Sequence, residues 1–256
     1  SPGASMLDQA PLTPWLPDET LFSWCARFHR MSCHSLPATT TRALFGHKYL
    51  GSAHDFPSQI DSFVDKTNGE LGTSASLIQE RTILPLYTSF QNQGVAEMAT
   101  KAMRGPSIGA LKFRLGLQTS NFRANFPLKS CPACMAEDAE KHGTAYWHRS
   151  HQLSGVWVCV HHGTLLCECT LKATGAQRFG WCLPQKANLR DNPYVPDAVA
   201  IQRLMKLAEA AQQLAEIPLG TSFDRAAVGY VQRTRMQLLG FGSSKGRLKP
   251  ESIGQA

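Results

Sequence analysis

The sequence predicts a mainly α-helical protein with a zinc-knuckle module and short strands at its centre. Apolar residues recur at helical spacing in the first and last thirds of the chain, whereas the middle carries close pairs of cysteine and histidine. The 256 residues are 43% hydrophobic, which is enough to bury ordinary cores. No run of 18 apolar residues occurs, so no membrane-spanning helix is predicted.

Composition shifts and prolines divide the chain. Ser1–Ser5 precede Met6 and are typical of a tag remnant, and Pro193 and Pro196 mark a break in periodicity that we interpret as a linker. We therefore expect four segments: a tag remnant or disordered start at 1–11, an N-terminal helical, helix-turn-helix-like domain at 12–105, a zinc-binding module at 106–190, and C-terminal helices at 191–256.

The first helical segments follow from caps and periodicity. Asp18–Thr20 predicts a helix start with acidic residues in the first turn, where the helix dipole favours them. The apolar residues that follow it at helical spacing are Leu21, Trp24, Cys25 and Phe28. This helix is expected to end near 31–34. A second, short helix is expected over 38–45, stopped by Gly46.

Two further short helices are expected at 58–65 and 74–81, each with a serine near its start. Their apolar residues can pack the two helices together, which is consistent with a helix-turn-helix and equally with an ordinary helical hairpin. Apart from Gln79 and Arg81, the second helix offers few side chains that read bases. Residues 95–103 predict another helix, and the alternation of apolar and basic residues over 111–117 predicts a short extended segment.

The central motif pairs Cys131-Pro-Ala-Cys134 with Cys159-Val-His-His162, with 24 residues between Cys134 and Cys159. Four soft ligands in two close pairs suit one tetrahedral Zn²⁺ ion. His162 is the preferred fourth ligand, since C-x-x-H then copies the spacing of C-x-x-C, and His161 remains the alternative. The nearby His148 and His151 are interpreted as hydrogen-bonding neighbours of the site rather than ligands.

Positive charge is concentrated in two blocks of a chain whose net charge is +7. Residues 98–136 contain six Lys or Arg and no acid, and residues 224–249 contain six against Asp224 alone. Such blocks favour contact with phosphate backbones or with an acidic partner, although a merely solvated surface explains them equally well. The candidate nucleic-acid or partner contacts are Lys101, Arg104, Lys112, Arg114, Arg225, Arg233 and Arg235.

Five motifs in order resemble the TniQ/TnsD family of transposon target-site selectors. They are LPDETLFSW (16–24), LIQERTILPLY (77–87), CPAC (131–134), WHR with HQL (147–149 and 151–153), and CVHHG (159–163). The resemblance implies a non-catalytic adaptor with helix-turn-helix elements and bound zinc. Such an adaptor recognises attachment-site DNA or an RNA-guided CRISPR complex, and it recruits the AAA+ ATPase that regulates transposition in a Tn7-like or CRISPR-associated transposon. Some members form homodimers.

The chain departs from the family pattern after Gly163. A second cysteine-rich knuckle is common there, and Cys167, Cys169 and Cys182 are its candidate ligands, but Gln185 stands where a C-x-x-C would place the fourth. The second metal site is therefore expected to be lost or only partly occupied. Beyond it, helices are expected over 198–215 and 224–239, and the family comparison suggests a short or truncated member.

The leading expectation is the adaptor, acting in the bacterial cytoplasm and at the nucleoid during transposition. The alternative is an autonomous, sequence-specific, zinc-containing DNA-binding protein, which would make base contacts from a recognition helix. Enzymatic activity is not expected, because no carboxylate cluster of transposase or nuclease type occurs and four protein ligands leave zinc no open position.

Overall fold

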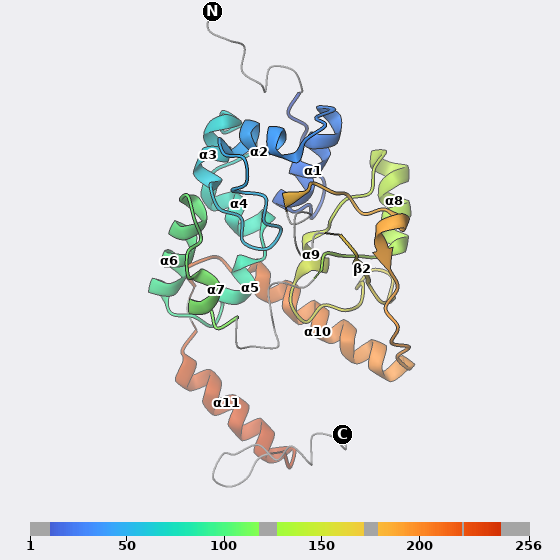
Figure 1. Cartoon of the computed structure of the whole chain (residues 1–256). Coiled ribbons are helices and arrows are strands. Elements are labelled where there is room, and N and C mark those ends of the chain that lie inside the picture. The colour runs from blue at the N-terminus through green and yellow to red at the C-terminus, as the bar shows by residue number, and fades with distance from the viewer. Residues whose placement is uncertain (1–10, 118–126, 172–178, 222, 242–256) are drawn as a thin grey trace, which may run out of the picture.

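The computed structural model describes residues 11–117, 127–171, 179–221 and 223–241. Most of the described secondary structure is helical, and one small three-stranded antiparallel sheet lies in the central region (Figure 1). The mainly α-helical class with a central Cys/His cluster is thus confirmed. The segment interpreted as a tag remnant, apart from Pro11, lies outside the described residues.

Helix α1 (Leu21–Met31) begins where the sequence predicts, although its acidic neighbours play a different part. Thr20 is the N-cap, and its side chain accepts a hydrogen bond from the Ser23 N–H at 3.0 Å. Asp18 and Glu19 precede the helix instead of lying in its first turn. Helix α2 (Pro37–Phe45) starts on proline and ends at Gly46, whose φ of 72° is the left-handed conformation of a helix C-cap.

The next helices form the left side of the molecule in Figure 1. They are α3 (Ile60–Lys66), α4 (Ser74–Arg81), α5 (Leu84–Thr88), α6 (Gln93–Arg104) and α7 (Leu111–Arg114). Helices α3 and α4 pack on each other and on α6, as the predicted hairpin requires. The hairpin therefore exists, and its role depends on where its polar side chains point.

The prediction of an extended segment over 111–117 is wrong. Residues Leu111–Arg114 form the short helix α7, and Leu115 N–H donates to Leu111 O at 2.9 Å. Leu111 and Leu115, four residues apart, are buried, while Phe113 is 64% exposed. The run of alternating residues also fits one helical turn whose inner side is leucine, and packing decides between the two.

The sheet ties together residues far apart in the sequence. Strand β2 (Cys167–Cys169) lies between β1 (Lys129–Ser130) and β3 (Leu189–Arg190), and both pairings are antiparallel. Around it lie α8 (Pro132–His142), α9 (Arg149–Gln152) and the 3₁₀ turn η3 (Lys186–Asn188). Because the strands are two or three residues long, the sheet alone cannot hold this region together.

The C-terminal helices differ in how they are used. Helix α10 (Ala198–Glu216) packs on α5, and its buried positions are Ala208, Ala211 and Ala215, which share one side of the helix. Small residues allow a close approach of the two backbones. Helix α11 (Arg225–Leu238) lies apart from the body in Figure 1, and none of its described residues is buried.

One hydrophobic core runs through the three folded segments that the sequence suggests. It includes Trp24 and Phe63 from the first, Trp147 and Cys159 from the second, and Ala211 from the third. The domain division stays a prediction, and the shared core means that the segments are packed closely against each other. No described helix is both long and apolar enough to cross a membrane.

Candidate metal centre

The structure brings Cys131, Cys134, Cys159 and His162 together, with one ligand atom of each within 4.8 Å of the others. Cys131 follows β1 and is the N-cap residue of α8, which places Cys134 in the first turn of that helix. Cys131 and Cys159 are fully buried, Cys134 is nearly so, and His162 is partly exposed. Both halves of the sequence motif therefore converge although the chain between them is long.

The second half of the motif is a tight turn. Cys159 N–H donates to Thr164 O and Gly163 N–H donates back to Cys159 O, both at 2.8 Å. Gly163 has φ 61°, the left-handed region that glycine enters without strain. This turn directs His162 toward the sulfurs, and His161 is exposed to solvent instead.

The distances fit a tetrahedral zinc ion. His162 Nδ1 lies 3.5 Å from Cys131 Sγ, 3.4 Å from Cys134 Sγ and 3.5 Å from Cys159 Sγ. The Cys134 and Cys159 sulfurs are 3.6 Å apart. Zinc–sulfur and zinc–nitrogen bonds of about 2.3 and 2.0 Å give tetrahedral edges of about 3.5 to 3.8 Å. The three sulfurs and one nitrogen are therefore spaced as zinc ligands, and their soft donor chemistry suits the same ion.

The protein groups themselves favour a thiolate at this place. Interaction with the neighbouring Cys134 and Cys159 thiols holds the pKa of Cys131 well below its usual range and raises the pKa of those two thiols. Thiolate is the form that binds metal. The cluster can thus lose its first proton readily, and a cation would then stabilise the remaining thiolates.

Glu137, one turn after Cys134 on α8, supports the histidine. Its Oε1 lies 3.0 Å from His162 Nε2, and this contact raises the pKa of His162 and lowers that of Glu137. With Nε2 donating to the carboxylate, Nδ1 carries the lone pair that faces the sulfurs. A carboxylate–histidine–metal arrangement of this kind fixes the tautomer of a ligand.

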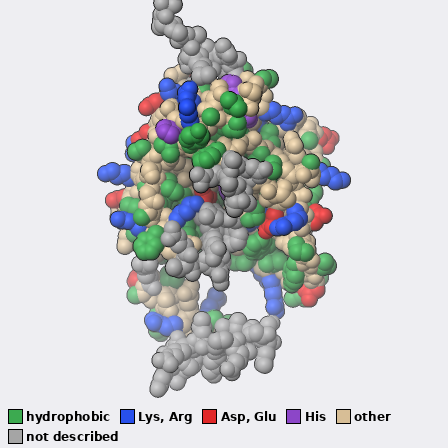
Figure 2. All heavy atoms as spheres, in the orientation of Figure 1, with side chains coloured by type: hydrophobic (Ala, Val, Ile, Leu, Met, Phe, Trp, Pro, Cys, Tyr) green, Lys and Arg blue, Asp and Glu red, His purple; other side chains and the backbone are tan. Residues whose placement is uncertain are grey.

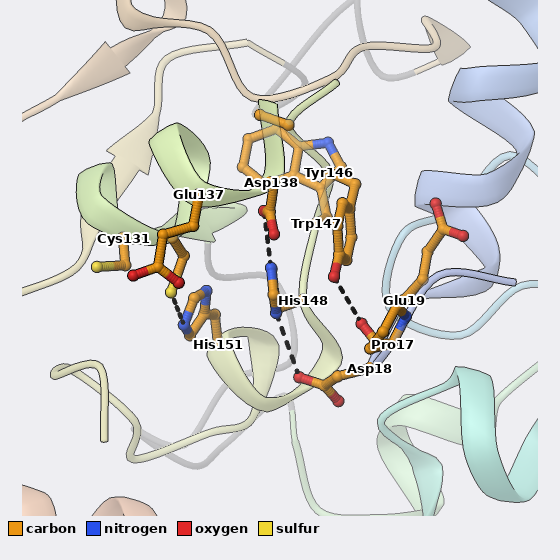
Figure 3. Close-up of polar contacts among 12 residues, drawn as sticks. Pro17, Asp18, Glu19, Cys131, Glu137, Asp138, Tyr146, Trp147, His148 and His151 are labelled. Atoms are coloured by element: carbon orange, nitrogen blue, oxygen red, sulfur yellow. Dashed lines mark hydrogen bonds and ion pairs between the residues drawn. The ribbon is translucent and has the colours of Figure 1, made fainter. Parts of the chain in front are cut away.

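Two histidines flank the cluster, as Figure 3 shows. His151 is 2% exposed, its Nε2 lies 4.0 Å from Cys134 Sγ, and burial lowers its pKa to about 3, so its ring is neutral. His148 Nε2 lies 2.9 Å from Asp138 Oδ2, and its Nδ1 lies 3.8 Å from Asp18 Oδ2. Neither belongs to the cluster of converging ligand atoms, in agreement with their interpretation as neighbours.

Helix α8 therefore connects the cluster to the N-terminal part. Its Asp138 reaches His148, and His148 reaches the Pro17–Glu19 turn, where Asp18 has the left-handed φ of 54°. Tyr146 donates to Pro17 O at 2.9 Å from the same side (Figure 3). These contacts place the start of α1 directly against the metal-binding module.

Lys129 corrects one expectation about charge. The sequence places it in a block of positive charge that was expected at the surface. In the structure its side chain is only 2% exposed and donates to the carbonyls of Leu153 and Val156. Its Nζ also lies 4.9 Å from the centre of the Trp157 ring. Burial lowers the pKa of Lys129 to about 7. This lysine holds the module together and is not available to a partner.

The candidate second site looks different. Cys167 and Cys169 lie at the two ends of β2, and Cys167 Sγ contacts Asp191 Oδ1 at 3.3 Å. Desolvation raises the pKa of Cys167 to about 11, which disfavours the thiolate. Together with Cys182 these residues form no second converging cluster among the described residues. Occupation of this site stays a prediction.

The candidate contact residues are distributed over the molecule. Arg104 pairs with Asp61 at 2.8 Å and Lys112 pairs with Asp55 at 2.5 Å, whereas Lys101 and Arg114 are exposed on α6 and α7. Arg225, Arg233 and Arg235 lie on α11. On the face shown in Figure 2, Lys and Arg are spread around the outline and interspersed with Asp and Glu. The described Lys and Arg side chains form no continuous basic stripe on that face.

Gln79 and Arg81, the two residues of α4 considered for base reading, contact other parts of the same chain. The Gln79 amide donates to Ala215 O and Ile217 O, and its oxygen accepts from Leu219 N–H at 2.7 Å. The Arg81 guanidinium lies 4.7 Å from the centre of the Trp15 ring. Helix α4 therefore does not present these side chains as a recognition helix would.

Arg149 and the Glu19–Arg27 pair are residues whose roles sequence reasoning missed. Arg149 donates to Thr82 O, Gln79 O and Ala215 O at 2.7, 3.0 and 2.8 Å. Arg27 and Glu19 form a buried bidentate ion pair at 2.7 and 2.8 Å. Arg149 and Glu19 lie inside two of the five family-like motifs, which marked them without revealing what they contact, whereas Arg27 lies outside all five.

Comparison with known proteins bears directly on the region just described. Residues 12–166 match the model of the TniQ family, a span that contains α1 to α9 and all four residues of the Cys/His cluster. The chain is also 31% identical over 151 residues to the transposon Tn7 transposition protein TnsD of Escherichia coli. That alignment covers 58% of this chain and 30% of TnsD, so the chain spans well under two thirds of that relative. By the match over residues 12–166, the chain belongs to the TniQ family.

Proposed function

We propose that this chain is a non-catalytic target-selection adaptor of a Tn7-like transposon. In this role it recognises the insertion target, either attachment-site DNA or an RNA-guided CRISPR complex, and recruits the AAA+ ATPase that regulates transposition. The observation that carries the proposal is the TniQ match over residues 12–166, together with the similarity to TnsD. Because the chain aligns with only part of TnsD, the activity of that whole protein is an inference here.

We propose Zn²⁺ as the metal, held by Cys131, Cys134, Cys159 and His162. The spacing of the four ligand atoms and the Glu137 contact to His162 support this assignment. When bound, the ion would supply structural stabilisation, since four protein ligands leave no coordination position for water or substrate. Such a closed site supports a scaffold role over hydrolysis.

An adaptor accounts for the polar surface better than an autonomous DNA reader does. The side chains that α4 would use to read bases are bonded internally, and two of the candidate phosphate contacts are paired with aspartates. Two of the exposed candidate contacts, Lys101 and Arg114, line a groove that also carries Glu80 and Glu97. Such a mixed surface suits a protein partner more than a phosphate backbone.

The test is a pull-down of the chain with the AAA+ regulator of its own transposon, with and without DNA, beside DNA titrations at two salt concentrations. We expect regulator binding together with weak DNA binding that falls steeply as salt rises. A Lys101→Glu, Arg114→Glu variant should lose one of these two interactions, whereas the control Arg190→Glu, which breaks an exposed pair with Glu168, should keep both. Tight binding of the chain alone to one DNA sequence, retained at high salt, would establish the autonomous DNA-binding protein instead.

A further inference from the structure

The α4–α6 side of the protein carries a groove that takes no part in the metal centre. It lies between α4, α6 and the 105–111 segment, with residues 218–220 also on its wall, and its volume is about 1390 Å³. None of the four candidate metal ligands lines it. Because small-molecule sites measure roughly 300–1,000 Å³, this groove is of a size for a polypeptide segment.

The floor of the groove is apolar and is held in place by the core. Met98, Ile108 and Leu219 line the groove and pack on the hydrophobic core, and Leu111, which also lines it, belongs to the core itself. These side chains are anchored from behind, so the floor is formed before anything binds. Apolar side chains that lie on it leave water, which favours binding.

The charges along the groove are ordered. Asp61 Oδ1 lies 2.8 Å from Arg104 Nε and accepts from the Ser74 hydroxyl at 2.5 Å, so the end of α6 lies beside the start of α4. From this shared end, Glu80 lies six residues along α4 and Glu97 lies seven residues back along α6. At a rise of about 1.5 Å per residue, both carboxylates are displaced from the shared end by about 10 Å.

The chain itself leaves these charges largely unneutralised. Lys101, one turn before the end of α6, is exposed at the shared end, and it forms no ion pair with another described residue. Glu80 is well exposed, and its one ion-pair contact among the described residues, to Arg81, is 3.9 Å long. Glu97 accepts a hydrogen bond from the uncharged Gln93 amide at 2.8 Å. One end of the groove is therefore negative and the other carries a positive side chain.

This arrangement separates the possible occupants. Three acids and three bases line the groove, so it has no excess of positive charge to attract a phosphate backbone. They are Asp61, Glu80 and Glu97 against Lys101, Arg104 and Arg114. A polypeptide can carry a charge of each sign with apolar side chains between them, which matches both ends of the groove and its floor at once.

We propose that the groove binds a short polypeptide segment of another protein. A basic side chain of this segment meets Glu80 and Glu97, apolar side chains cover the floor, and an acidic side chain meets Lys101. At about 3.3 Å per residue, an extended segment places its two charges about three residues apart. The proposal depends neither on the transposition role nor on the metal.

The test is a selection of phage-displayed random dodecapeptides on the whole 256-residue chain. We expect enriched peptides in which a basic and an acidic residue flank apolar ones, and synthetic copies should bind in fluorescence anisotropy. Ala75→Trp, which fills the groove from an exposed position on α4, should weaken this binding at least tenfold. Ala210→Trp is the matched control, because it adds the same ring at an exposed position of α10 outside the groove and should leave binding unchanged.

A change in the charges of the groove should change the charges of the selected peptides. The Glu80→Lys, Glu97→Lys variant makes both ends positive, so it should select peptides with acidic residues on both sides of the apolar ones. Lys101→Glu should select peptides with basic residues on both sides. Circular dichroism checks that each variant is folded. If the peptide charges are the same for both variants, if no selected peptide loses affinity in Ala75→Trp, or if no peptide is enriched at all, the proposal is wrong.

Discussion

Glu19 and Arg27 show how a charged residue can belong to the interior. The Glu19 side chain is completely buried, and Arg27 meets it with two nitrogens while a third contacts the Thr13 hydroxyl at 3.3 Å. Helical periodicity separates the sides of a helix but does not identify a partner eight residues away, so the sequence alone does not predict this pair. The pair fixes the 13–19 segment against α1.

Breaking this pair from one side should be costly. Arg27→Met leaves an unpaired buried carboxylate, and we expect the free energy of unfolding to fall by about 3–5 kcal/mol in urea denaturation. The double variant Glu19→Gln, Arg27→Met should recover a large part of that loss. Arg190→Met, which removes an exposed ion pair, is the control and should cost less than about 1 kcal/mol. Equal losses in the single and double variants would contradict this account.

His29 predicts a pH dependence at the α1–α2 corner. Its Nδ1 lies 2.6 Å from Thr40 Oγ1, which also contacts His34 Nδ1 at 2.8 Å, and burial followed by repulsion from His34 lowers the pKa of His29 below 6.5. Below about pH 6.5 the unfolded chain therefore binds a proton that folded His29 does not, so stability falls as the pH falls.

The comparison of interest is the slope of the unfolding free energy between pH 7 and 5. We expect His29→Gln to lose stability less steeply than the unchanged protein, by at most about 1.4 kcal/mol per pH unit, because one proton is involved. Titrating groups far from His29, the metal ligands included, are common to both proteins and cancel in the difference. Parallel slopes would show that His29 titrates alike in the folded and unfolded states.

At the scale of elements, the end of α10 is held by side chains from three other helices. Arg149 and Gln79 both donate to Ala215 O, and the Ser89 hydroxyl donates to Leu214 O at 3.0 Å. A guanidinium at a helix C-terminus also complements the helix dipole. Helix α10 lies beyond the TniQ match, yet it depends on residues inside it.

Arg149→Ala should therefore loosen α10 more than any other described element. We expect a loss of about 2–4 kcal/mol, since it leaves several carbonyls without a donor, and faster amide hydrogen exchange in α10. Arg81→Ala is the matched control, because that arginine lies over an aromatic ring and does not bond to the end of α10. This change should cost about 1 kcal/mol or less. If the amide hydrogen exchange of α10 is unchanged in Arg149→Ala, then Arg149 does not hold the end of this helix.

Local sequence signals were sufficient where a cap or a turn decides the structure. Thr20 and Gly46 marked helix boundaries, and the Cys/His spacing indicated which four residues converge. They failed at Leu111–Arg114, where four residues can satisfy strand and helix periodicity alike and burial makes the choice. The contacts that hold the end of α10 and the Glu19–Arg27 pair could not be predicted, because they join separate segments of the chain and no local pattern encodes them.

At the scale of the whole molecule, the metal centre is the point from which the other parts are placed. Helix α8 carries Cys134, which faces the cluster, and Asp138, which reaches the turn before α1 through His148. Cys159 and Leu153, which directly follows α9, share the same core with Ala211 of α10. Short strands and buried alanines offer little independent stability, so we expect the bound ion to supply a large share of the folding free energy.

The most direct measurement is the metal content of the purified protein, by mass spectrometry under native conditions and elemental analysis, with circular dichroism before and after chelation. We expect one zinc per chain, loss of structure on chelation, and an unfolded central region in Cys131→Ser. Glu137→Gln should stay folded and bind zinc about 10–100-fold more weakly, because its partner His162 keeps all of its metal-facing geometry but loses a carboxylate. A well-folded Cys131→Ser protein that contains no metal would contradict the central claim.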